Sequence, residues 1–113
     1  MLTWSGVVKN KPTSYSIQIT VNKNQITTVL IGRHYLKKHS SYMNDDLILE
    51  LVGSLDGHSF PIDSISSGIE YYVADVHLSS TDKTYRIIWL FEGEKLEILG
   101  VINAYRRVRK RKV

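Results

Sequence analysis

Two histidines lie in a short basic stretch, GRHYLKKHSS, and could exchange protons with a phosphodiester. His34 and His39 are five positions apart, with Lys37 and Lys38 between them. An imidazole that titrates near neutral pH beside cationic side chains suits general acid–base catalysis. The spacing is not the i, i+4 pair that shares a helix face, and no carboxylate lies nearby at ligand spacing, so we expect no metal site. The alternative is a polar helix face that carries ordinary surface histidines.

Arg86 lies in an otherwise apolar stretch, TYRIIWLF, whose composition is typical of a central β-strand. An arginine among apolar neighbours needs a partner, because an unpaired buried charge is costly. The partner could be a carboxylate on a neighbouring strand, either Asp75 or Glu97. It could also be a scissile phosphate, which a planar guanidinium binds in a bidentate manner. Spacing alone favours the structural pairing with a carboxylate.

The chain ends in INAYRRVRKRKV, where an apolar stretch changes abruptly to six basic residues in eight. A tyrosine beside arginines can stack on an unpaired base while the cations hold phosphates, as in many single-stranded nucleic-acid sites. We therefore expect Tyr105, Arg106 and Arg107 to be ordered next to the last strand. The basic residues from Arg109 onward (109–113) are expected to form a flexible tail.

Apolar spacing predicts the elements that must position these side chains. Alternation in SYSIQITV, followed by the β-branched run ITTVLI, predicts an N-terminal β-hairpin. Asn44 is a typical helix cap, and the apolar stripe after it predicts a helix over residues 45–55, with a shorter helix at 33–41. Short turns between three apolar runs predict an antiparallel meander. The strands of this meander are expected at residues 69–79, 84–91 and 95–104.

These elements predict an α+β fold in a single domain, residues 1–108. We expect the antiparallel meander to pack against one main helix and a short helix, with the hairpin at the N-terminus. The last two strands are almost continuously apolar, so both faces of the sheet should be covered. The main helix would cover one face, and the hairpin or a partner would cover the other.

Composition limits the function classes further. The 113 residues are 42% hydrophobic and 23% charged, as in a folded protein, and the absence of cysteine excludes disulfides and thiolate metal sites. Six of the 15 Lys and Arg residues lie at positions 106–112, so residues 1–105 carry 9 against 11 Asp and Glu. Basic character concentrated in this way points to a phosphate backbone as partner. The N-terminus lacks the apolar region of a signal peptide and no stretch could span a membrane, so we expect a cytoplasmic protein.

The order of these segments resembles the RelE/ParE-like toxins of toxin–antitoxin pairs. The resemblance rests on a helical segment before an antiparallel sheet, a YRIIW strand, an ILGVINAYRR strand and a basic end. The run HYLKKH…MNDDLILELVGSLDG is similar to a branch in which an early histidine precedes the main helix. The resemblance covers about residues 30–107. The SYSIQITV hairpin is longer than the single first strand expected in that family.

The resemblance implies that helices cover one sheet face and that RNA binds the other. In members that cleave mRNA, it implies a metal-independent endoribonuclease, a hydrolase that needs no cofactor. The positions that match the family's catalytic residues are His34 (early histidine), Arg86 (sheet arginine) and Tyr105 (late tyrosine). Those expected to bind nucleic acid are Lys37, Lys38, His39, Arg106, Arg107 and Arg109. The implied partners are RNA, in some members on the ribosome, and an antitoxin protein.

Two other functions remain open, because the ParE-like branch has lost ribonuclease chemistry. One is a non-catalytic protein of the same fold that binds nucleic acid or another partner. The other is a toxin-like fold that acts on a protein target. Cleavage through the ribose 2′-hydroxyl requires a base, an acid and cations near the developing charge, which His, Tyr, Lys and Arg can supply.

Overall fold

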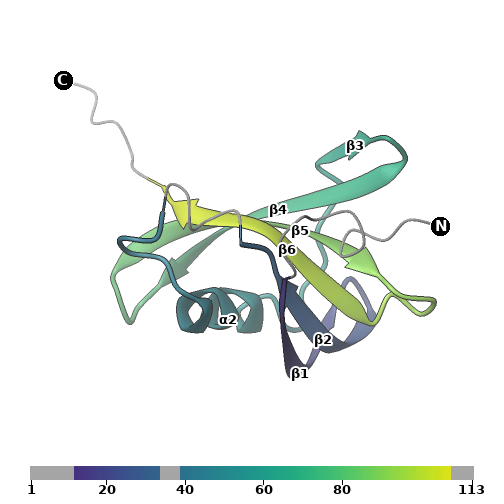
Figure 1. Cartoon of the computed structure of the whole chain (residues 1–113), viewed down its shortest axis with the longest axis horizontal. Helices are drawn as coiled ribbons and strands as arrows, with labels where there is room; N and C mark the ends of the chain where they lie inside the picture. Colours follow the sequence, from purple (N-terminus) through teal and green to yellow (C-terminus); the bar gives the residue numbers. More distant parts are fainter. Residues whose placement is uncertain (1–11, 34–38, 108–113) are drawn as a thin grey trace.

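The computed structural model describes residues 12–33 and 39–107, and these residues form a six-stranded mixed sheet with one helix on one of its faces (Figure 1). Across the sheet the strands follow the order β1-β2-β6-β5-β4-β3. The elements are β1 (Thr13–Val21), β2 (Asn24–Ile31), α2 (Asp45–Gly53), β3 (Ser64–Ser66), β4 (Ile69–Leu78), β5 (Lys83–Glu92) and β6 (Ile98–Arg106). An α+β arrangement of one helix and one sheet is therefore confirmed.

The N-terminal hairpin is confirmed, but its place in the fold differs from the prediction. β1 and β2 pair antiparallel, and the positive φ angles of Asn22 (52°) and Lys23 (65°) are those of a tight two-residue turn. β2 then pairs in parallel with β6, where Ile31 lies opposite Val101. The expectation that the hairpin could cover the second face of the sheet is therefore wrong. Apolar periodicity shows which face of a strand is buried, but it does not show which strand lies beside it.

The meander is confirmed as three antiparallel strands, β4, β5 and β6. The sheet as a whole is nevertheless mixed, because β2 and β6 pair in parallel. A parallel pair needs a long crossover. The connection between β2 and β6 contains α2, β3, β4 and β5. β2 and β6 are therefore neighbours in the sheet despite their distance in sequence.

The main helix, predicted over residues 45–55, begins at Asp45 and ends at Gly53. The Asn44 side chain accepts a hydrogen bond of 2.8 Å from the backbone N–H of Leu47, which satisfies one of the free donors at the helix start. Gly57 has a φ of 81° in the turn that follows the helix, a backbone conformation that favours glycine. The short helix predicted at 33–41 falls mainly on residues 34–38, outside the described residues.

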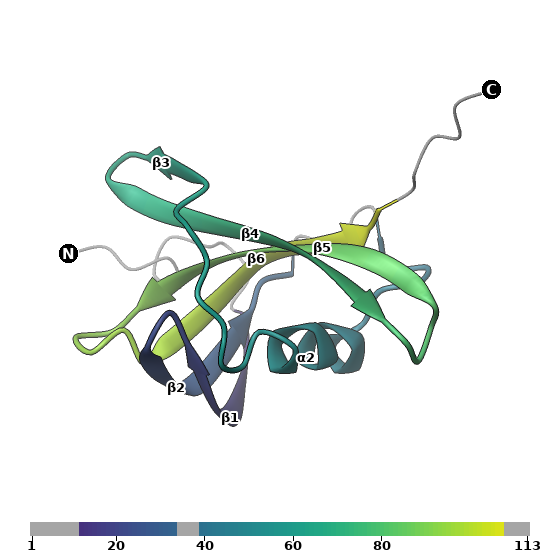
Figure 2. The same ribbon diagram turned by 180° about the vertical axis from the view of Figure 1, so that it is seen from behind.

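The core fills the space between α2 and the sheet face that α2 covers (Figure 2). Trp89 on β5 lies at its centre with no exposed surface. Its ring is edge-on to Phe60 at 5.1 Å and stacked on Tyr72 at 5.8 Å between ring centroids. The indole N–H has no hydrogen-bond acceptor among the described residues. Among the described residues, the contribution of Trp89 to the core is packing against Phe60 and Tyr72.

The segment between α2 and β4 contains one strand that the sequence did not predict. Residues 58–63 are irregular, apart from a bridge between His58 and Val21. The short strand β3 follows them and forms the edge of the sheet beside β4. Among the described residues, no helix has the length and apolar character required to cross a membrane.

Candidate functional site

The sheet face opposite α2, the helix-free face, carries the candidate site. Tyr85, Ile87 and Trp89 of β5 are buried in the core on the α2 side, so Arg86 and Ile88 between them point to the helix-free face. The described residues place no helix on this face (Figures 1 and 2). Its middle is apolar, with Ile88 half-buried, and its polar end lies where β6 ends.

Four side chains form a line across this polar end. Asp75 on β4 lies opposite Arg86 on β5, and Arg86 lies opposite Tyr105 on β6. His39, from the turn beside β6, stacks on Tyr105 with ring centroids 5.5 Å apart and an angle of 26° between the planes. We call Asp75, Arg86, Tyr105 and His39 the cross-strand row. Three strands and one turn thus bring together residues that are up to 66 positions apart in the sequence.

The partner that Arg86 requires is Asp75, one of the two carboxylates proposed from the sequence. The guanidinium donates from Nε to Oδ1 at 2.8 Å and from Nη2 to Oδ2 at 3.2 Å. This hydrogen bonding lowers the pKa of Asp75 below its usual value, against the opposing effect of partial burial. The pKa of Arg86 is raised, first by the hydrogen bond to Asp75 and then by hydrogen bonding to Tyr105. Arg86 is therefore a permanent cation.

Tyr42 holds the aromatic end of the row in place. Its hydroxyl oxygen lies 2.9 Å from Nδ1 of His39 and accepts a hydrogen bond of 3.1 Å from the backbone N–H of Arg106. The backbone N–H groups of Tyr42 and Met43 both donate to the carbonyl of His39. These contacts fix the turn against the end of β6. The His39 ring is therefore held by Tyr42 on one side and by Tyr105 on the other.

The two arginines that follow Tyr105 point in different directions. Arg106 lies opposite the buried Tyr85, on the α2 side of the sheet, and its guanidinium carbon stands 4.6 Å from the centroid of the Tyr42 ring. Arg107 extends to the helix-free face, where its Nε lies 3.8 Å from Oδ2 of Asp75. Arg107 thus adds a second cation beside the cross-strand row, whereas Arg106 supports the Tyr42 turn.

Four of the predicted site residues cannot be placed. His34, Lys37 and Lys38 fall in the gap before His39, and Arg109 follows the last described residue. Of the other five, four lie in or beside the cross-strand row, namely Arg86, Tyr105, His39 and Arg107. Arg106 is the exception, because it lies on the opposite face.

Sequence reasoning missed the part played by Tyr42. Tyr42 lies in the segment between the basic stretch and Asn44, where no apolar periodicity marks a strand or helix. Only the pairing of its hydroxyl with His39 and with the backbone of β6 reveals its role. A tyrosine three positions after a histidine in a turn is too common a pattern to identify in advance.

Arg33, part of the same basic stretch, has a structural partner. Its Nη1 donates to Oγ1 of Thr13 at 2.9 Å and lies 3.6 Å from Oδ2 of Asp45. Tyr15 donates to the same carboxylate oxygen at 2.5 Å, and this hydrogen bond raises the pKa of Tyr15. Asp45 therefore joins the start of α2 to β1 and to the end of β2. The Arg33 side chain contributes to the fold, away from the cross-strand row.

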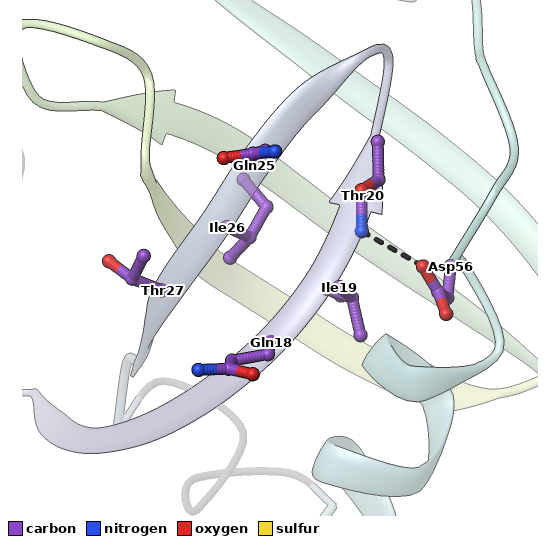
Figure 3. Close-up of a pocket in the computed structure, with 7 residues that line it drawn as sticks. All are labelled: Gln18, Ile19, Thr20, Gln25, Ile26, Thr27 and Asp56. Carbon is purple, nitrogen blue, oxygen red and sulfur yellow. Dashed lines mark hydrogen bonds between the residues drawn. The ribbon is translucent and has the colours of Figure 1, made fainter.

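A shallow hollow of about 520 Å³ lies elsewhere, on the N-terminal hairpin (Figure 3). Asp56 is the one ionisable residue that lines it, and its Oδ1 accepts a hydrogen bond of 2.8 Å from the backbone N–H of Thr20. The remaining lining residues are Gln18, Ile19, Gln25, Ile26 and Thr27. Because the Asp56 carboxylate already joins the loop after α2 to β1, the hollow offers little chemistry for a ligand.

The described residues contain no group of three or more His, Cys, Asp or Glu side chains that could hold a metal ion. Comparison with protein-family models, with curated proteins and with solved structures found no match. The cross-strand row therefore has to be interpreted from its own chemistry. A permanent cation and a second arginine, which could bind a phosphate, lie on this face with a histidine–tyrosine stack, which could receive a base.

The Asp75–Arg86 pair predicts a pH dependence of stability. The pKa of Asp75 is lowered in the folded state, which means that the ionised carboxylate stabilises the fold. This stabilisation of the fold is complete above the unfolded-state pKa and is lost as the pH falls through the folded-state pKa, below about pH 4. Asp75→Asn should therefore be less stable than wild type at pH 7, with a difference that shrinks below about pH 4. Urea unfolding at both pH values measures this. Asp63→Asn, an exposed carboxylate outside the row, is the matched control, and a difference for Asp75→Asn that does not change with pH would contradict the assignment.

Proposed function

We propose that this protein is a RelE/ParE-like toxin that binds RNA on its helix-free face and cleaves it as a metal-independent endoribonuclease in the cytoplasm. The observation that carries the proposal is the cross-strand row. It aligns Arg86 and Tyr105, the two matched catalytic positions within the described residues, as direct neighbours on β5 and β6. The family resemblance implies this arrangement, with a helix on one face of the sheet and cationic and aromatic residues on the other.

Each member of the row has a task in this reaction. The Tyr105 and His39 rings offer a stacking surface for an unpaired base. The Arg86 guanidinium, with Arg107 beside it, would bind the scissile phosphate and stabilise the charge that develops on it. In the free protein, the Asp75 carboxylate accepts hydrogen bonds from Nε and Nη2 of Arg86. The phosphate must therefore displace this carboxylate from at least one of the two nitrogens.

The bond changes balance without a metal ion. The 2′-oxygen attacks phosphorus and transfers its proton to a base, the bond between phosphorus and the 5′-oxygen breaks, and an acid protonates that oxygen. The products are a 2′,3′-cyclic phosphate and a 5′-hydroxyl. The groups proposed to transfer these protons are Tyr105 and His34, of which His34 lies outside the described residues.

The test is RNA cleavage in EDTA, with and without ribosomes. We expect wild-type protein to release fragments with 2′,3′-cyclic phosphate ends, and Tyr105→Ala to release them at least about tenfold more slowly. Tyr71→Ala is the matched control, a tyrosine of β4 outside the cross-strand row, and should cleave at the wild-type rate. RNA that stays intact with wild-type protein under both conditions would exclude the endoribonuclease.

A second candidate function, non-catalytic RNA binding, is favoured by the hydrogen bonds that Arg86 already makes to Asp75. Two of its guanidinium nitrogens are already engaged by Asp75, which leaves a cationic and stacking surface but less freedom to stabilise a reacting phosphate. The same samples distinguish the two candidates. Intact RNA that is nevertheless retained by the wild-type protein, and released by Tyr105→Ala, would identify a binding protein. An antitoxin protein is a further proposed partner, whether the protein cleaves RNA or only binds it.

A further inference from the structure

A hairpin projects from the sheet at the end remote from the cross-strand row (Figures 1 and 2). β4 pairs with β5 only from Tyr72 onward, so Ile69, Glu70 and Tyr71 pair with β3 alone among the described strands. We call residues 61–70 the β3–β4 arm. Every residue in it is exposed.

The arm exposes three isoleucines within eight positions. Ile62 is 44% exposed, Ile65 is 64% exposed and Ile69 is 37% exposed. Ile65 lies on β3 itself, Ile62 precedes that strand, and Ile69 on β4 lies opposite Ser66 and so points to the other face of the arm. An exposed large apolar side chain on an edge strand is notable, because an edge strand invites pairing with another chain. The arm therefore has the character of an unoccupied interaction surface.

The backbone of the arm is also prepared for pairing. Ser67 and Gly68 have positive φ angles of 52° and 78°, which define a tight turn in which Ser66 and Ile69 form a hydrogen-bonded pair. In an antiparallel ladder the neighbouring residue points its N–H and C=O groups the opposite way. The backbone groups of Ile65 therefore face outward from the edge of the sheet. An extended segment could bond to them as a further strand.

The root of the arm is held rigidly. The Asn22 side chain donates from Nδ2 to the carbonyl of Phe60 and accepts from the Phe60 N–H through Oδ1, both at 2.8 Å. Phe60 also packs edge-on against the buried Trp89. The arm is thus fixed at its base, which reduces the ordering cost of binding a partner.

Charge indicates the kind of partner. Glu70 lies directly opposite Ile65, and Asp63, the exposed residue just before β3, donates its backbone N–H to the carbonyl of Tyr71 at 2.9 Å. No Lys or Arg occurs from residue 39 to residue 82, whereas eight acidic residues do, namely Asp45, Asp46, Glu50, Asp56, Asp63, Glu70, Asp75 and Asp82. Because Ile65 and Glu70 project from the same face of the arm, they are complementary to an extended segment that carries an apolar and a basic side chain two positions apart. A second copy of the arm would instead bring like charges together.

We propose that the β3–β4 arm is a docking site for a basic, extended protein segment, which adds as a strand to the outer edge of β3. An apolar side chain of the segment packs on Ile65, and a Lys or Arg side chain two positions away, on the same face, pairs with Glu70. This partner is a protein and binds at the opposite end of the sheet from the cross-strand row. The inference is therefore independent of the proposed action on RNA.

The test titrates the full chain, labelled with ¹⁵N, at physiological salt with a capped six-residue peptide, Ser-Val-Ser-Lys-Ser-Val, which presents Val and Lys on one face (the Val–Lys peptide). We expect saturable shifts confined to the amides of the β3–β4 arm and of Tyr71 and Tyr72. A Val–Glu peptide of the same length should cause no such shifts. Ile65→Ser and Glu70→Lys should each weaken Val–Lys binding at least about fivefold. Asp82→Lys makes the same charge change outside the arm, in the β4–β5 turn, and should bind as wild type does.

Three results would overturn the proposal. The first is no binding of the Val–Lys peptide up to millimolar concentration, or shifts that map to another surface. The second is equal binding by wild type and Glu70→Lys, which would remove charge as the basis of recognition. The third is a dimer in sedimentation that Ile65→Ser converts to monomer, because the arm would then be occupied by a second copy. The amide spectrum of each variant shows whether it has folded.

Discussion

Replacing Arg86 with alanine is expected to lower the rate of RNA cleavage by about 100-fold or more, the usual cost of losing a charged group that stabilises a transition state. Arg86 is the cation at the centre of the cross-strand row, opposite Tyr105 on one side and Asp75 on the other. The measurement is the rate of cleavage of a defined RNA in EDTA by equal amounts of folded wild type and variant.

Two further variants separate chemistry from structure. Arg86→Lys keeps the charge but loses the planar pair of donors, so it should cleave at an intermediate rate. Lys83→Ala removes an exposed cation from the same strand and should leave the rate unchanged. Thermal unfolding controls for the loss of the Asp75 pair. Cleavage by Arg86→Ala at the wild-type rate would show that Arg86 has a structural role only.

Replacing Trp89 with alanine is expected to lower the free energy of unfolding by about 3–5 kcal/mol, the range for removing a large buried aromatic side chain. Trp89 has no exposed surface and joins Phe60 and Tyr72 at the centre of the core. Its loss would leave a cavity between the sheet and the root of the β3–β4 arm. Urea unfolding of the two proteins measures the difference.

Trp89→Phe is the informative partner variant. The indole N–H has no acceptor among the described residues, so this change removes volume but no hydrogen bond, and should cost less than half as much as Trp89→Ala. An equal loss of stability in the two variants would contradict this account, because it would mean that the N–H has a partner on which the fold depends.

Local elements of this fold could be predicted from the sequence, and their lateral arrangement could not. The helix at Asp45–Gly53 follows from one cap and one apolar stripe, and the hairpin and meander follow from alternation and short turns. The parallel contact between Ile31 and Val101 has no such signal, since it depends on which strands meet after the chain has crossed the sheet. β3 was missed because three exposed residues carry no periodicity.

The candidate site was predictable where residue type alone limits the options. An arginine in an apolar strand requires a partner, and Asp75 was one of two carboxylates that could provide it. The stack of His39 on Tyr105 was not predictable, because it depends on a turn that Tyr42 fixes against β6. Arg106 and Arg107 are adjacent in sequence but lie on different faces of the sheet. Arg106 lies on the α2 side, and Arg107 lies on the helix-free face.

The central claim is that RNA binds the polar end of the helix-free face. The most direct test is an amide and side-chain NMR titration with a short single-stranded RNA whose 2′-oxygens are methylated, so that it cannot be cleaved through them. The account predicts shifts grouped on Arg86, Tyr105 and His39, with none on the exposed side of α2. Shifts grouped on α2 or on the β3–β4 arm, or no binding at physiological salt, would contradict it.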